Sequence, residues 1–248
     1  MSWRYESLSL RLFSPIIAIG TLTYFAVHSS SLVEKQIHTF SIVARDSESG
    51  AIGIGVASKY LAVGSAVPWA KANVGGTATQ SYVNTNLGAD SLILLAQGKS
   101  PEEVTKVLLD SDPGKEMRQL GLVDSKGNTF AFTGSRCLAW AGSKQGKGYT
   151  VQGNLLTGPE VLEEMSAAFE STKASFAKRI FDALLAGEKA GGDKRGKQSA
   201  AILIVREKGG PNRLGDREID LRVDDNLNPL LELGRLLQLK GVVMKNEK

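Results

Sequence analysis

The chain has 248 residues, of which 42% are hydrophobic and 23% charged, a composition typical of a globular protein with one large domain or two small ones. The formal net charge of +4 is mild, and the basic residues are spread along the chain without the interleaved aromatic residues of a nucleic-acid surface. We therefore expect a solvated surface and no nucleic-acid partner.

Cysteine and histidine are scarce. Cys137 is the only cysteine, which excludes a disulfide within the chain and a cysteine-based zinc cluster. Both histidines, His28 and His38, precede Thr39, so the residues after Thr39 contain no imidazole. This excludes a Ser-His-Asp triad, a Cys-His pair and a histidine-ligated metal site from residues 39–248. We expect no metal and no cofactor there.

The first 38 residues differ from the rest. Residues 11–27 form a mostly apolar run behind Arg4 and Arg11, which is short for a membrane span and suits a signal-peptide core. Three interpretations stay open: an exported or membrane-anchoring leader, a start codon assigned too far upstream, and a structural extension. We expect 1–38 to be an N-terminal extension and 39–248 a single domain. A cytoplasmic location is expected unless residues 11–27 export the chain or anchor it to a membrane.

Regular elements begin at Thr39. Two β-rich runs, 39–45 and 51–58, are joined by a turn in which Gly50 can take a positive φ, and together they predict a β-hairpin. Further elements are predicted as a strand over 75–83 and helices over 88–97 and 100–112. The second helix has a capping box, with Ser100 as N-cap and Glu103 three residues later.

The second half of the chain alternates in the same way. It predicts a hairpin over 118–134, a strand over 148–156, amphipathic helices over 158–172 and 175–191, strands over 198–207 and 217–225, and a closing helix over 228–240. Hairpins outnumber βαβ units, so we expect antiparallel sheets with helices on their outer faces, an α+β architecture.

Two glycine-rich segments do not fit nucleotide-binding motifs. Gly53 and Gly55 resemble the start of a dinucleotide fingerprint, but Ser58 stands where the third glycine belongs and no helix follows. A strand with close backbone neighbours explains these glycines better. Residues 141–149 have the wrong spacing for a phosphate-binding loop, so ATP binding is not expected.

Several strings carry a family resemblance. They are "TFSIVARD", "GVAS", "AVGSAVPWAKA", "DPGKEMRQLGLVD", "FTGSRCLAWAG", "GYTVQGNLLTGPEV", "GGDKRGKQSAAILIV" and "DLRVDDNLNPLLEL". In this order, from Thr39 to about Leu239, they closely resemble the bacterial family called domain of unknown function 1028. That family is similar in fold to the N-terminal nucleophile (Ntn) hydrolases. The resemblance therefore implies an αββα four-layer sandwich of two antiparallel sheets flanked by helices, while the activity of the family is largely unassigned.

Thr39 is the candidate nucleophile. Many members of the resembled family begin Met-Thr-Phe-Ser-Ile-Val-Ala, so removal of the initiator exposes the threonine. Here His38 precedes Thr39, and a free amine requires a cut after His38 by a signal peptidase, another protease or self-cleavage. An α-amine has an ordinary pKa of about 7.7 to 8.0 and can accept the hydroxyl proton while Oγ attacks a carbonyl. This chemistry needs no imidazole.

The other candidate residues lie near predicted strand ends. Asn154 is the first candidate for an oxyanion donor, with a simple turn residue as the alternative. Asp193 is the third candidate catalytic residue, beside Thr39 and Asn154, although it could instead form a surface ion pair with Arg195. Lys59 could lower the pKa of the amine or be solvated. The residues expected to contact substrate are Ser58, Lys59, Arg195, Gln198 and Ser199.

Three functions remain open. The leading hypothesis is an amidohydrolase that cleaves a small amide or peptide-like bond, with Thr39 exposed by removal of residues 1–38, and that forms a homo-oligomer. The alternative is a non-catalytic small-ligand-binding or interaction protein that keeps the fold. The third is a metal-assisted hydrolase that uses Asp193, Asp224 and Asp225, although Asp225 also suits a helix N-cap. A membrane partner is expected only if the leader is retained.

Overall fold

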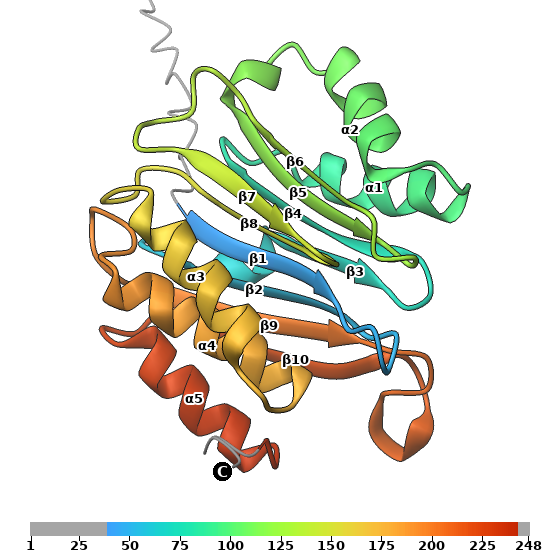
Figure 1. The fold of residues 1–248 in the computed structure, drawn as a ribbon, viewed down its shortest axis with the longest axis vertical. Coiled ribbons are helices and arrows are strands. Elements are labelled where there is room, and N and C mark those ends of the chain that lie inside the picture. Colours follow the sequence, from blue (N-terminus) through green and yellow to red (C-terminus); the bar gives the residue numbers. More distant parts are fainter. Residues whose placement is uncertain (1–38, 243–248) are drawn as a thin grey trace, which may run out of the picture. The chain divides into compact units, whose positions relative to one another are not determined.

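The structure is a computed structural model that describes residues 39–242 (Figure 1). The predictions made for residues 1–38, including the apolar run over 11–27, lie outside the described residues. None of the helices between residues 39 and 242 is long and apolar enough to span a membrane.

Two antiparallel sheets form the centre of the domain. The larger sheet has the strand order β10-β9-β2-β1-β8-β7. Its strands are β1 (Thr39–Arg45), β2 (Ile52–Ser58), β7 (Gly142–Gly146), β8 (Tyr149–Gly153), β9 (Ser199–Val205) and β10 (Arg217–Val223). The smaller sheet has the order β3-β4-β5-β6. Its strands are β3 (Pro68–Lys71), β4 (Gly75–Ser81), β5 (Arg118–Asp124) and β6 (Thr129–Thr133).

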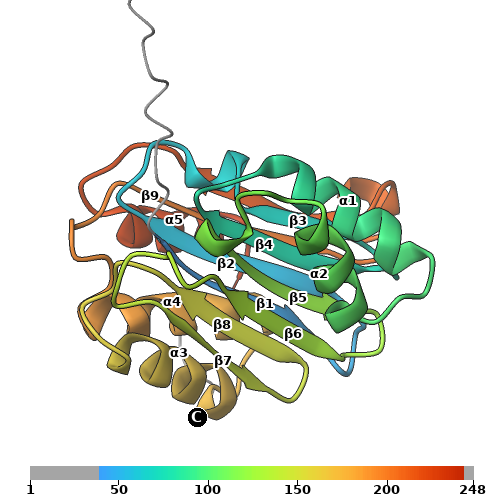
Figure 2. The same ribbon diagram turned by 90° about the horizontal axis from the view of Figure 1, so that it is seen from above.

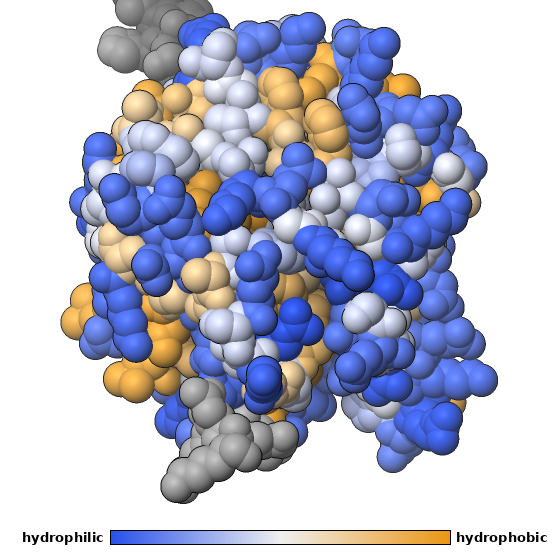
Figure 3. All heavy atoms as spheres, viewed as in Figure 1, coloured by the Kyte–Doolittle hydropathy of each residue, from blue (hydrophilic) through white to orange (hydrophobic). Residues whose placement is uncertain are grey.

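Helices cover the outer face of each sheet (Figures 1 and 2). The smaller sheet carries α1 (Thr85–Ala96) and α2 (Pro101–Asp110), and the larger sheet carries α3 (Glu160–Ser171), α4 (Phe176–Lys189) and α5 (Pro229–Leu239). The predicted α+β sandwich, with two antiparallel sheets between two helical layers, is confirmed. The face seen in Figure 3 is largely hydrophilic, with smaller hydrophobic patches, as the predicted solvated surface requires.

Alternation along the strands divides the core into layers. In β1, Phe40, Ile42 and Ala44 belong to the apolar cluster under α3, α4 and α5. Val43 belongs instead to the cluster between the sheets, where it meets Ile54 of β2. Side chains of successive strand residues point to opposite faces, so this assignment places Thr39 and Ser41 between the sheets as well.

Several local predictions hold in the structure. Gly50 has a φ of 72°, the left-handed conformation expected for the turn between β1 and β2. The capping box at α2 is present, since the Ser100 hydroxyl accepts from Glu103 N and the Glu103 carboxylate accepts from Ser100 N. The predicted N-cap at Asp225 is wrong. The closing helix begins at Pro229 with Asn228 as its N-cap, because the fixed φ of proline suits the first helical position.

Candidate functional site

Four of the predicted site residues meet at one end of the larger sheet. Because β1 is antiparallel to both β2 and β8, its first residue lies beside the ends of those two strands. Thr39 pairs with Ser58, and Phe40 pairs with Gly153, the residue before Asn154. Ser58 in turn pairs with Ser199 at the start of β9. The topology therefore gathers residues from four distant segments of the sequence.

Thr39 is fully buried and held at both its hydroxyl and its carbonyl. Its Oγ1 donates to Ser58 Oγ at 3.2 Å. Its carbonyl oxygen accepts from the Asn154 backbone N–H at 3.0 Å and from Gln80 Nε2 at 3.4 Å. The threonine at the start of the central strand thus has a fixed position and orientation.

A buried amide network lies behind Thr39, between the two sheets. Gln119 Oε1 accepts from Gln80 Nε2 at 2.8 Å and from Asn154 Nδ2 at 2.9 Å. Gln119 Nε2 donates to Gly153 O at 2.8 Å. All three amide side chains are completely buried. Hydrogen bonds of this kind fix which way each amide points, because its oxygen and its NH₂ group have different partners.

The network continues away from Thr39 along β1 and β8. Ser41 Oγ donates to Gln80 Oε1 at 2.7 Å, and Gln152 Nε2 donates to Ser41 Oγ at 2.5 Å. Gly121 of β5 makes room for this chain, since a Cβ atom there would lie 2.1 Å from Gln152 Oε1. These polar residues were not predicted from the sequence. The available signal was their alternation with apolar residues, which places them on one face of each strand.

Strained backbone surrounds the same end of the sheets. Ser81, immediately after Gln80, has a φ of 70°, and Leu155, immediately after Asn154, has a φ of 50°. Ala62, four residues after Ser58, has a φ of 54°. Left-handed conformations cost energy for residues other than glycine, so the surrounding contacts have to hold these three residues in place.

Asp193 holds the loop beside this cluster. Its side chain is 1% exposed, and Oδ2 accepts from Lys59 N at 3.0 Å and from Arg195 Nη2 at 2.7 Å. Its Oδ1 accepts from Arg195 N at 2.9 Å. Within residues 39–242 it makes no hydrogen bond to Thr39. The ion pair with Arg195, the alternative to a catalytic role, is therefore present with the carboxylate buried, and the hydrogen bond from Lys59 N fastens the loop to the end of β2.

Nearby backbone atoms form hydrogen bonds with three of the residues expected to contact substrate, Lys59, Gln198 and Ser199. Lys59 Nζ donates to Lys197 O at 3.2 Å, and Gln198 N donates to Ser58 O at 3.0 Å. Ser199 Oγ donates to Tyr60 O at 2.5 Å and is itself fully buried. A small cavity of about 50 Å³, lined in part by Ser58 and Asp193, lies beside this loop.

The described residues offer no group of three or more His, Cys, Asp or Glu side chains with the geometry to hold a metal ion. The three aspartates of the metal hypothesis have other partners. Asp193 pairs with Arg195, Asp224 pairs with Arg222 at 3.0 Å, and Asp225 accepts from Gln198 Nε2 at 3.1 Å. Burial raises the pKa of the Cys137 thiol, which disfavours the thiolate that a nucleophile needs.

Comparison with known proteins assigns the family. The model of a family of unknown function, DUF1028, matches residues 39–233. The chain belongs to the DUF1028 family. The match begins at Thr39, the first residue of β1.

A solved DUF1028 structure has a similar fold. The crystal structure of the protein SPO2555 from Silicibacter pomeroyi, of the same family, shares 35% sequence identity with this chain. The two superpose with a TM-score of 0.76, over 83% of this chain and 87% of the other. No curated protein matches the chain. The predicted family is therefore confirmed, and its function has to be argued from the site.

Proposed function

We propose that this DUF1028 protein is an amidohydrolase that cleaves a small amide or peptide-like bond, with Thr39 as an N-terminal nucleophile after removal of residues 1–38. The observation that carries the proposal is the placement of Thr39. It is the first residue of the central strand, its Oγ1 lies 3.2 Å from Ser58 Oγ, and its carbonyl is held by Asn154 and Gln80. The first residue matched by the family is also Thr39.

The mechanism follows from the groups at this sheet end. The freed α-amine of Thr39 takes the proton from Oγ1, directly or through water, as Oγ1 attacks the substrate carbonyl. Ser58 Oγ orients the attacking hydroxyl through the hydrogen bond between them. Collapse of the tetrahedral intermediate expels the amine product, which receives the proton from the α-ammonium. Water then hydrolyses the ester on Thr39, with the same amine as base.

Asn154 is the proposed donor to the tetrahedral oxygen. Its side chain is buried and its orientation is set by the hydrogen bond from Nδ2 to Gln119 Oε1. A preorganised donor in a site that excludes water is worth more than the same donor in water, and the loss of one costs about 2.7 to 4 kcal/mol in other enzymes. Asp193 and Arg195 support the site by holding the loop next to Ser58.

The first test is the state of the N-terminus. Intact mass and N-terminal sequencing of the native protein should give a chain that begins at Thr39. That protein should hydrolyse members of a panel of small amides and dipeptides. Thr39→Ala should lower the turnover at least about a hundredfold, Thr39→Ser should retain part of it, and Thr129→Ala, a strand threonine away from the site, should leave it unchanged. Retention of residues before Thr39 in every molecule would contradict the mechanism.

One observation favours a second candidate, a non-catalytic small-ligand-binding or interaction protein. Thr39 is completely buried in a hydrogen-bonded network, which is also how a structural threonine is held. This function requires no cut after His38. It predicts that no amide in the panel is turned over and that Thr39→Ala leaves ligand binding nearly unchanged.

A further inference from the structure

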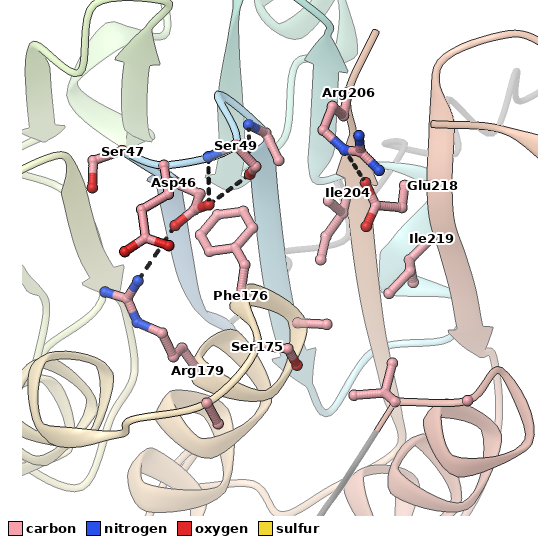
Figure 4. Close-up of a pocket in the computed structure, with 16 residues that line it drawn as sticks. Asp46, Ser47, Ser49, Ser175, Phe176, Arg179, Ile204, Arg206, Glu218 and Ile219 are labelled. Carbon is pink, nitrogen blue, oxygen red and sulfur yellow. Dashed lines mark hydrogen bonds and ion pairs between the residues drawn. The ribbon is translucent and has the colours of Figure 1, made fainter. Parts of the chain in front are cut away.

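A second site lies at the end of the larger sheet opposite to Thr39. A cavity of about 540 Å³ opens there, within the size range of small-molecule sites (Figure 4). It is lined by the turn between β1 and β2 (Asp46–Ala51), the start of α4, the end of β9, the start of β10 and the segment after α5. None of these residues belongs to the cluster around Thr39.

The base of the cavity is apolar. Phe176 projects into it between the two strands and the turn, and Ile204 and Ile219 line it beside Phe176 (Figure 4). Phe176 is held in place by Phe169, with ring centroids 6.5 Å apart in an edge-to-face arrangement. The base therefore presents a hydrophobic surface to a bound molecule.

One wall carries a loose ion pair. Arg179 Nη1 lies 3.7 Å from Asp46 Oδ1, a distance too long for a hydrogen bond. Each partner is fixed by other contacts. The Arg179 guanidinium stacks 4.3 Å from the centroid of Phe169 and donates from Nε to Phe169 O, while Asp46 Oδ2 accepts from Ser49 N and Oγ. Both groups thus line the cavity while other contacts hold them in place.

The facing wall carries a second pair. Arg206 Nε donates to Glu218 Oε2 at 2.7 Å, and Figure 4 shows this pair across Phe176 from Asp46 and Arg179. Among the described residues, the terminal nitrogens of Arg206 and Arg179 make no hydrogen bond. Planar guanidinium groups with open terminal nitrogens are suited to bind a carboxylate.

The balance of charge selects the class of ligand. The cavity is lined by three carboxylates, from Asp46, Glu48 and Glu218, against two guanidinium groups. A simple anion would meet an excess of negative charge, and a simple cation would leave the guanidinium nitrogens unused. We propose that this cavity binds a small zwitterion with an apolar body, of the class of a hydrophobic dipeptide. The carboxylate binds an arginine, the ammonium binds a carboxylate, and the side chains rest on Phe176 and the isoleucines.

The test is isothermal titration calorimetry of the whole protein with leucyl-phenylalanine at low ionic strength and pH 7. We expect saturable binding of one dipeptide per chain. N-acetylation or C-terminal amidation of the dipeptide should each weaken binding about tenfold or more, because each removes one charge. Arg206→Gln and Asp46→Asn should weaken it about fivefold or more, while Arg235→Gln, which removes a paired surface arginine on α5, should not.

Three results would overturn the proposal: no saturable heat at millimolar dipeptide, equal binding of the free and blocked dipeptides, or wild-type affinity in both cavity variants. Circular dichroism of each variant checks its fold. Should Arg206→Gln fail to fold, Asp46→Asn and the blocked dipeptides still decide the question. The titration is repeated with full-length Thr39→Ala protein, in which the proposed nucleophile is absent and no dipeptide is turned over, so its outcome is independent of the proposed amidohydrolase activity.

Discussion

Gln119 links the two sheets by hydrogen bonds at the end of the domain where Thr39 lies. Its amide accepts from Gln80 and Asn154 and donates to the carbonyl oxygen of Gly153, so one side chain joins β5 to β4 and β8. Net stabilisation by a satisfied hydrogen bond is small, about 1 kcal/mol. Removal of one buried partner is costlier, since each polar group left unpaired lowers the free energy of unfolding by about 1 to 3 kcal/mol.

Gln119→Leu should therefore lower the free energy of unfolding by about 3 kcal/mol, since the buried amides of Gln80 and Asn154 both lose their acceptor. Urea unfolding at pH 7 measures the change. Gln238→Leu, the same substitution at an exposed position on α5, should change it by less than about 0.5 kcal/mol. Similar values for the two variants would show that the network contributes nothing specific.

Residue identity alone predicted only part of the site. Thr39, Ser58 and Asn154 were predicted and do lie together, because antiparallel pairing of β1 with β2 and β8 brings strand ends to one edge. Gln80 and Gln119 could not be predicted, since a glutamine on a strand is usually solvated and only the facing sheet buries these two.

At the scale of elements, α4 lies unusually close to β2. Gly53 and Gly55 are on the face of β2 that meets this helix, where a Cβ atom would lie 2.3 Å and 2.6 Å, respectively, from the nearest atom of Ile180. The Gly-x-Gly pattern that resembles a dinucleotide fingerprint is therefore explained by packing, as expected from a strand with close backbone neighbours.

Gly55→Ala should lower the free energy of unfolding by about 1 to 3 kcal/mol, because the added methyl group overpacks the contact with Ile180. In an Ile180→Ala background the same substitution should cost less, since the opposing side chain is gone. A double-mutant cycle by urea unfolding measures the coupling. Equal costs in both backgrounds would mean that the contact with Ile180 does not cause the destabilisation.

Helices and buried strands were easier to predict than edge strands. The helices begin at recognisable caps or show a 3.6-residue apolar period, and the buried strands β1, β2 and β9 are rich in β-branched residues. Two strands were missed, β3 and β7, and each lies at an edge of its sheet. β3 has four residues and starts with proline, and β7 reads GSKQG. Short, polar edge strands lack the alternation that identifies a half-buried strand.

At the scale of the whole domain, ionisable groups on different elements restrict the pH range of stability. Hydrogen bonds from Arg118 lower the pKa of Asp112, and hydrogen bonds from Ser100 and from Ser135 lower the pKa values of Glu103 and Glu116. A carboxyl group with a lowered pKa stabilises the fold above its unfolded pKa of about 4, and this contribution is lost as the pH falls through the folded pKa.

Tyr149 sets the alkaline limit. Burial, together with the hydrogen bond to the Glu170 carboxylate, raises the pKa of Tyr149 to about 12, against about 10 in an unfolded chain. The pKa of the Tyr149 phenol is higher in the fold than in the unfolded chain. Its contribution to the stability of the fold is therefore fully present below about pH 10. This contribution declines as the pH rises from about 10 and is absent above about 12. The fold should therefore be most stable between about pH 5 and 9.

Comparison of the wild type with two variants separates these groups from the general titration of the surface. At pH 7, Tyr149→Phe should unfold more easily by about 1 to 2 kcal/mol, because Ser166 and Glu170 lose a partner. The difference should shrink between about pH 10 and 12, because in this range the phenol is ionised in the unfolded chain but still protonated in the fold. The Asp112→Asn difference should likewise shrink as the pH falls below about 4, because the carboxyl group of the unfolded chain protonates before the one in the fold, whose pKa is lowered. Urea unfolding at each pH gives both differences. A Tyr149→Phe difference that stays constant up to pH 12 would show that the phenol ionises as freely in the fold as in the unfolded chain.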